Sequence, residues 1–183
     1  HRQHRKAANI QFSRFNPMHF RKRMQLNFRN HRKLVIVDEH TAFVGGYNIG
    51  DEYLRADWRD THLLIKGPAA LSFQLGFSED WQWATGQLPE LQWQPAPAMG
   101  QQAVMCINPG PADHWESASL FVCQLIQSAK QRCWLVSPYF VPDQALISHL
   151  QLAVLRGVDV RVLLPEKTDN RLVQLARTRT IKE

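Results

Sequence analysis

One segment of the sequence places an imidazole, an amine and an amide at fixed spacing. His31 stands two residues before Lys33, Asp38 follows after four more residues, and a glycine pair ending at Gly46 precedes Asn48. Residues two apart in an extended chain share a face, so His31 and Lys33 project together. A neutral imidazole can attack phosphorus or transfer a proton near neutral pH, and an ammonium beside it stabilises a five-coordinate phosphorus transition state. The spacing therefore predicts a phosphodiester site.

The remaining residues of this segment have different expected roles. Gly46 lets the backbone approach a phosphate closely, and the Asn48 amide can donate a hydrogen bond to it. Asp38 lies an odd number of steps from Lys33, so it faces the other side of the strand or lies in the turn. A carboxylate beside an anionic substrate would repel it. We therefore interpret Asp38 as a residue that orients the hairpin turn.

The complete pattern resembles the signature of the phospholipase D superfamily. The segments around it are similar to bacterial cardiolipin synthases in particular, at residues 27–30, 49–53, 58–62, 138–143 and 156–161. The tripeptide alone is uninformative, because His4-Arg5-Lys6 repeats it with Gln11 where the pattern requires Asp and without a following glycine pair. The specific signal is the extended pattern.

This resemblance implies a two-lobed α/β sandwich in which each lobe contributes one motif to a shared site. One histidine becomes a phosphohistidine and the other protonates the leaving alcohol. The resemblance also assigns His31, Lys33 and Asp38 to the active site and implies that no metal or other cofactor is needed. In agreement with this, the eight histidines lack the spacing of metal ligands. His62 is interpreted as a structural polar residue.

The substrate implied by the resemblance is phosphatidylglycerol, which would serve as both donor and acceptor in a transferase that makes cardiolipin and releases glycerol. Such an enzyme acts at an anionic membrane surface, here the bacterial inner membrane, with any anchor outside this chain. Two alternatives stay open. Another phospholipase D-type phosphodiesterase, a phospholipase or a nuclease, would use the same residues, although the flanking segments do not favour nucleic acid as a partner. A non-catalytic module that binds anionic surfaces would need residues 1–37 alone.

The distribution of charge supports an anionic partner. Residues 1–37 contain ten Lys and Arg and no acid, whereas the whole chain has 22 bases and 16 acids and a net charge of +6. A basic arm of this density suits a negatively charged membrane or polymer. The composition, 44% hydrophobic and 21% charged, is that of a globular protein and excludes disordered, collagen-like and disulfide-rich classes.

Hydrophobic periodicity predicts the elements that position the motif. Residues 34–37 and 41–44 form a hairpin, 61–65 a further strand, and 68–86 an amphipathic helix. After a Pro-rich stretch come a helix over 118–129, a strand over 133–140, a helix capped by Asp143 that stops at Gly157, a strand over 158–164, and a helix from Asn170. A strand, helix and strand at this spacing form a parallel crossover.

The chain contains a single complete motif. No second His-x-Lys follows residue 33. We therefore expect a fragment: the end of a first lobe over 1–85 (motif 31–48), a linker over 86–102, and the start of a second lobe over 103–183. The partner of His31 would belong to a second-motif half of the same protein, and the fragment alone is expected to be inactive.

Overall fold

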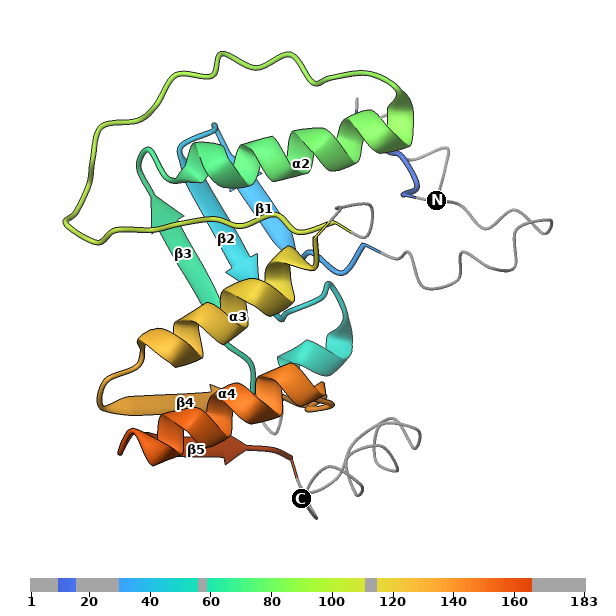
Figure 1. The fold of residues 1–183 in the computed structure, drawn as a ribbon. Coiled ribbons are helices and arrows are strands. Elements are labelled where there is room, and N and C mark those ends of the chain that lie inside the picture. The colour runs from blue at the N-terminus through green and yellow to red at the C-terminus, as the bar shows by residue number, and fades with distance from the viewer. Residues whose placement is uncertain (1–9, 16–29, 56–58, 111–114, 166–183) are drawn as a thin grey trace. The chain divides into compact units, whose positions relative to one another are not determined.

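The computed structural model describes residues 10–15, 30–55, 59–110 and 115–165 (Figure 1). The chain divides into two compact units, residues 1–108 and 109–183. Each unit combines helices with a sheet, which confirms the predicted α/β class. The partition into 1–85, 86–102 and 103–183 stays a prediction. The predicted helix from Asn170 and most of the basic arm lie outside the described residues.

The first unit is built on a three-stranded antiparallel sheet in the order β1-β2-β3. Its strands are β1 (Leu34–Val37), β2 (Thr41–Gly45) and β3 (His62–Lys66), as the hydrophobic pattern predicts. Ile36, Ala42 and Ile65 are directly opposite one another in the register. Because residues in one such row share a face, they form the core of the unit together with Ala70 of the covering helix.

The turn between β1 and β2 carries two residues in the left-handed region. Asp38 has φ 52° and Glu39 has φ 59°, and the N–H of His40 donates to the Val37 carbonyl at 3.2 Å. Two successive left-handed residues give a turn whose twist matches that of the flanking strands. Asp is one of the few residues besides Gly that adopts this conformation readily.

The covering helix, α2 (Ala70–Thr85), lies across one face of this sheet (Figure 1). It ends as predicted at Gly86, which has φ 76° and donates its N–H to the Gln82 carbonyl at 2.7 Å. A left-handed glycine at this position satisfies a carbonyl that the helix leaves open.

Burial along α2 differs from the simple apolar stripe that the spacing predicts. Phe73 packs into the core, but Phe77 is 40% exposed and stacks on Trp81 with a centroid separation of 6.0 Å. Two polar residues, Gln74 and Ser78, are buried instead. The Ser78 hydroxyl donates to the Gln74 carbonyl at 2.9 Å and accepts from its amide at 3.4 Å, so the pair satisfies itself inside the helix turn.

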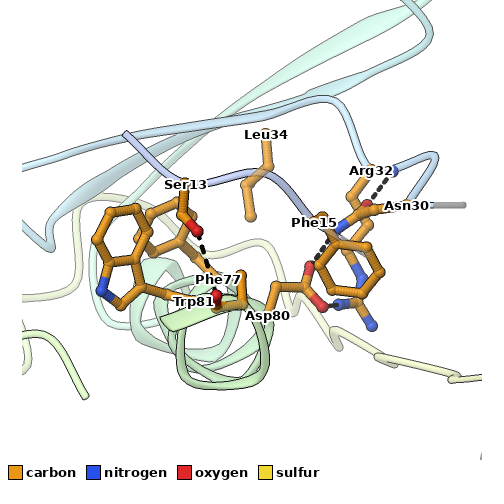
Figure 2. Close-up of a pocket in the computed structure, with 9 residues that line it drawn as sticks. Ser13, Phe15, Asn30, Arg32, Leu34, Phe77, Asp80 and Trp81 are labelled. Carbon is orange, nitrogen blue, oxygen red and sulfur yellow. Dashed lines mark hydrogen bonds and ion pairs between the residues drawn. The ribbon is translucent and has the colours of Figure 1, made fainter. Parts of the chain in front are cut away.

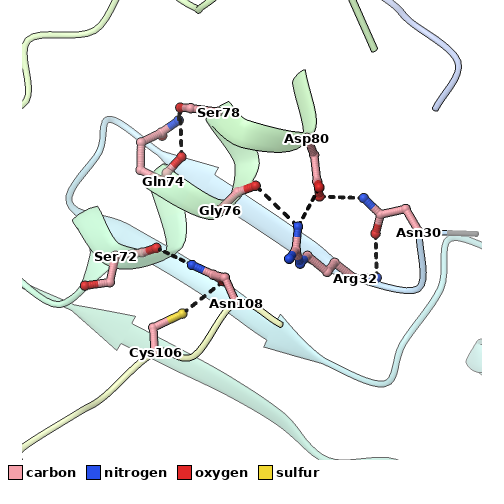
Figure 3. Close-up of polar contacts among 9 residues, drawn as sticks. All are labelled: Asn30, Arg32, Ser72, Gln74, Gly76, Ser78, Asp80, Cys106 and Asn108. Carbon is pink, nitrogen blue, oxygen red and sulfur yellow. Dashed lines mark hydrogen bonds and ion pairs between the residues drawn. The ribbon is translucent and has the colours of Figure 1, made fainter. Parts of the chain in front are cut away.

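The stretch between α2 and the second unit has no regular structure, yet it is attached to the first unit at two places. The Glu39 carboxylate accepts the backbone N–H groups of Gln92 at 3.0 Å and Trp93 at 2.8 Å. The Asn108 amide donates to the Ser72 carbonyl of α2 at 3.3 Å (Figure 3). Charge-assisted hydrogen bonds such as those of Glu39 are the stronger kind.

The second unit contains α3 (Ser117–Ser128), β4 (Arg132–Val136), α4 (Gln144–Leu155) and β5 (Asp159–Leu163). Strands β4 and β5 pair in parallel with α4 in the connection, as predicted. β4 ends at Val136, four residues before the predicted end at Phe140. Pro138 explains the difference, because proline has no N–H to donate to a neighbouring strand.

The core of the second unit joins both helices to the sheet. Ile126 of α3, Ala153 of α4 and Val158 are buried against one another. Asp143 caps α4 as predicted, with its carboxylate accepting the N–H of Leu146 at 2.7 Å. Among the described residues, no helix is both long enough and apolar enough to cross a bilayer.

Candidate active site

The two ends of the motif meet at one end of the first sheet. The N–H of Gly45 donates to the Lys33 carbonyl at 3.3 Å, and the N–H of Gly46 donates to the Thr61 carbonyl at 3.3 Å. The segment that begins with His31 therefore lies beside the segment that leads to Asn48. Folding of the hairpin brings together Lys33 and Gly45, which are twelve positions apart in the sequence.

His31 and Lys33 are on the side of the strand that faces away from α2. The evidence is Arg32, whose guanidinium binds α2, so the alternation of an extended chain directs its two neighbours the other way. His31 is exposed and Lys33 is half-buried. The Lys33 ammonium donates to the His31 carbonyl at 2.7 Å. This is the shared face that the spacing predicts, while the catalytic roles of both residues stay predictions.

Asp38 is at the other end of β1. Five residue steps at about 3.3 Å separate it from Lys33, a distance of about 16 Å along the strand. It is exposed in the left-handed turn. This position agrees with the interpretation of Asp38 as a turn residue, and its assignment to the active site stays a prediction.

The glycine pair makes room for the start of β3. A Cβ on Gly45 would be 2.5 Å from the Thr61 carbonyl oxygen, and a Cβ on Gly46 would be 2.2 Å from both carboxylate oxygens of Asp60. No side chain fits at either position without displacing its neighbour. Gly46 thus has a packing role that is independent of any phosphate, and its contact with a phosphate stays a prediction.

His62 is the first residue of β3 and pairs with Gly45 of the motif. Its ring stacks on Tyr47 with a centroid separation of 5.5 Å and an interplanar angle of 28°. Its Nδ1 is buried and has no hydrogen-bond partner among the described residues. This packing supports the interpretation of His62 as a structural residue.

Asn48 is exposed and its amide nitrogen donates to the Tyr53 hydroxyl at 2.6 Å. Tyr53 belongs to the short 3-10 helix η2 (Asp51–Leu54) and meets Tyr47 edge to face at 6.0 Å. The loop formed by residues 47–54 lines an open hollow of about 450 Å³. Tyr53 thereby fixes the Asn48 amide, which the sequence predicts to donate a hydrogen bond to a phosphate. The motif spacing does not predict this contact with Tyr53.

The described residues contain no group of three or more His, Cys, Asp or Glu placed to hold a metal ion. The resemblance likewise implies histidine chemistry. That no cofactor is needed stays an expectation.

Sequence reasoning missed one set of contacts at the motif. Asp80 of α2 binds both Asn30 and Arg32, the two residues that flank His31 (Figure 2). A signal for this was present in the helical spacing. Asp80 stands three residues after Phe77 and four before Ala84, so a carboxylate adjoins the apolar stripe of the predicted helix.

Known proteins similar to this chain are cardiolipin synthases. A family model described as "Cardiolipin synthase, PLD-like domain" matches residues 122–183. Cardiolipin synthase A of Pseudomonas putida (strain W619) is 51% identical over 161 residues, which cover 84% of this chain and 33% of the relative. Cardiolipin synthase A of Pseudomonas fluorescens (strain SBW25) and of Pseudomonas aeruginosa (strain LESB58) are each 50% identical over the same share of the chain. The chain spans about a third of the length of these curated relatives. The description of the family model, which matches outside the motif, and the names of the relatives indicate the same family as the motif over residues 31–48. The chain belongs to the phospholipase D superfamily, among the proteins similar to cardiolipin synthases.

Proposed function

We propose that this chain carries one of the two motifs of a phosphatidyltransferase that makes cardiolipin from two molecules of phosphatidylglycerol. The observation that carries the proposal is the backbone pairing of Lys33, whose ammonium binds the His31 carbonyl, with the first glycine of the pair that leads to Asn48. The names and identities of the relatives support the substrate class. The activity belongs to the whole protein that contains the chain.

In the proposed reaction an imidazole nitrogen attacks the phosphorus of the first phosphatidylglycerol. A phosphorus–nitrogen bond forms, the bond from phosphorus to the headgroup oxygen breaks, and glycerol leaves with a proton from a general acid. The hydroxyl of a second phosphatidylglycerol then attacks the phosphohistidine, and its proton returns to the same group. We favour His31 as the nucleophile. Lys33 would stabilise the charge on the equatorial oxygens, with Asn48 as a further donor.

The second imidazole of this reaction would come from the second-motif half of the same protein. The sequence of this chain contains no further His-x-Lys after residue 33. General acid catalysis commonly contributes about 10²–10⁴-fold, so the 183-residue chain alone should have no synthase activity. We also propose that the whole protein acts at the bacterial inner membrane, in cytoplasmic or peripheral association with it, where phosphatidylglycerol is available.

The test is an assay of the full-length protein with phosphatidylglycerol vesicles and, separately, with DNA. Wild type should form cardiolipin, His31→Ala should reduce the rate at least a thousandfold, and EDTA should leave the rate unchanged. The control is His40→Ala, which removes an exposed imidazole from the turn at the opposite end of β1 and should retain activity. Nicked DNA without cardiolipin would favour the nuclease alternative, which the basic arm also suits. Neither product would favour the binding module.

A further inference from the structure

The segment that carries His31 is attached to α2 through one carboxylate. The Asn30 amide donates to Asp80 Oδ2 at 2.5 Å, and the Arg32 guanidinium donates to Asp80 Oδ1 at 2.5 Å (Figures 2 and 3). Asn30 and Arg32 are the immediate neighbours of His31 on either side. One carboxylate therefore binds the side chains of the residues on both sides of the predicted nucleophile.

Two further hydrogen bonds make this attachment rigid. The Asn30 side-chain oxygen accepts the backbone N–H of Arg32 at 2.8 Å, which closes a turn around His31. The Arg32 guanidinium also reaches the Gly76 carbonyl of α2 at 3.5 Å (Figure 3). We call the set of Asn30, Arg32 and Asp80 the Asp80 clamp.

The surroundings of the clamp are half-buried and partly apolar. The side chains of Arg32 and Asp80 are 29% and 23% exposed. They line a cavity of about 230 Å³ whose other walls include Phe15, Phe77 and Trp81 (Figure 2). Partial exclusion of water strengthens the Arg32–Asp80 ion pair relative to a pair on an open surface. A hydrogen bond between two charged groups is also stronger than one between neutral groups, which favours a single geometry.

We propose that Asp80 is a positioning residue that sets the direction of the His31 imidazole and the Lys33 ammonium for phosphoryl transfer. The inference rests on the proposed function. β1 begins only at Leu34, and the first hydrogen bond to β2 is accepted by the Lys33 carbonyl. Among the described residues, the backbone before Lys33 is held by the clamp. A displacement of 1 Å in a reacting group can cost about 10²-fold in rate.

Two variants separate positioning from a general contribution to stability. Asp80→Asn removes the charge at constant size, and Asp80→Glu keeps the charge but moves it outward by one methylene group. If the clamp acts by geometry, both variants should have a lower rate of cardiolipin formation. If Asp80 acts through its charge alone, Asp80→Glu should keep the wild-type rate. Glu79→Gln is the matched control, because it removes one charge from an exposed position on the same turn of α2.

The experiment measures kcat and KM for cardiolipin formation by the full-length protein, together with amide hydrogen exchange. Asp80→Asn and Asp80→Glu should each lower kcat by 30- to 100-fold with KM within threefold, as fits a loss in the reacting geometry. Exchange over residues 30–33 should rise at least tenfold, with exchange in β2 and β3 within threefold of wild type. Glu79→Gln should stay within twofold throughout.

A kcat within threefold of wild type while exchange at 30–33 rises would overturn the proposal. So would an equal rise of exchange in all three strands, because the loss of rate would then follow from general destabilisation. If wild type and His31→Ala form the same amount of product, the proposed function fails instead. The rate at which diethyl pyrocarbonate modifies His31 then tests the inference independently of activity. A rate of modification in Asp80→Asn that differs from wild type supports positioning by Asp80, and an unchanged rate overturns it.

Discussion

Replacement of Gly46 by alanine should open the end of the sheet that carries the motif. The added Cβ would be 2.2 Å from both carboxylate oxygens of Asp60, well inside the 3.0 Å that real Cβ atoms respect. Asp60 must therefore rotate and give up the hydrogen bond that its Oδ1 accepts from the Thr61 N–H at 2.7 Å. Overpacking costs about 1–3 kcal/mol and a hydrogen bond to a charged group about 1.5–3 kcal/mol. We expect a total cost of about 3 kcal/mol.

Amide hydrogen exchange in the full-length protein measures this cost locally. About 3 kcal/mol corresponds to roughly a hundredfold faster exchange over residues 41–48 and 60–66, at about 1.36 kcal/mol per tenfold. The matched control is Gly100→Ala, because a Cβ at Gly100 meets no atom within 4 Å. This variant should exchange within threefold of wild type.

A second substitution identifies the obstructing group. Asp60→Ala removes the carboxylate, so Gly46→Ala/Asp60→Ala should exchange no faster than Asp60→Ala alone. Exchange in Gly46→Ala that stays within threefold of wild type would refute the reasoning. An additive double variant would show that the obstruction is not Asp60.

Three further predictions concern the turn, the basic arm and the second unit. Asp38→Asn keeps a residue suited to φ 52°, so its thermal midpoint should stay within about 2 °C of wild type and its specific activity within tenfold. Asp38→Val should lower the free energy of unfolding by about 1–2 kcal/mol in a thermal melt. An unchanged midpoint with a thousandfold loss of activity in Asp38→Asn would show that Asp38 takes part in the chemistry. Vesicles containing phosphatidylglycerol should bind the protein through residues 1–37 with a sharp loss at high salt, since each base contributes about 1 kcal/mol, and equal sedimentation with neutral vesicles would reject this role. The Arg161 guanidinium donates to the Asp159 carboxylate at 3.0 and 3.1 Å and holds the pKa of that carboxyl below its ordinary value. The pair therefore stabilises the folded protein at a pH above the ordinary carboxyl pKa, and this stability is lost as the pH falls through the lowered pKa. Arg161→Ala should therefore raise the pKa of Asp159 toward its ordinary value in an NMR titration, and an unchanged titration would contradict the assignment.

Much of the fold could be predicted because its signals are local. Two short apolar runs joined by a polar turn predict the β1–β2 hairpin, and Gly86 and Asp143 mark helix ends at the positions where the structure has them. The predicted end of β4 is wrong because apolar content continues beyond Val136, whereas strand pairing depends on a backbone N–H that Pro138 lacks.

The candidate site was only partly predictable for a different reason. The shared face of His31 and Lys33 follows from alternation within one strand. The contacts of Asn30 and Arg32 with Asp80 join residues about fifty positions apart. Helical spacing places Asp80 beside the apolar stripe of α2, but no local pattern pairs it with Asn30 and Arg32. The burial of Gln74 and Ser78 is hidden in the same way, since polar residues are ordinarily assigned to the exposed side of a helix.

The stretch between α2 and the second unit also determines where the chain can be cut. Glu39 holds Gln92 and Trp93 before Gly100, and the Asn108 amide binds Ser72 after it. Gly100 itself has open space around it. A protease nick at Gly100 would therefore leave both new ends attached to the first unit. Expressed as two polypeptides divided at this glycine, the chain should reassemble, which makes Gly100 a suitable split point for fragment complementation.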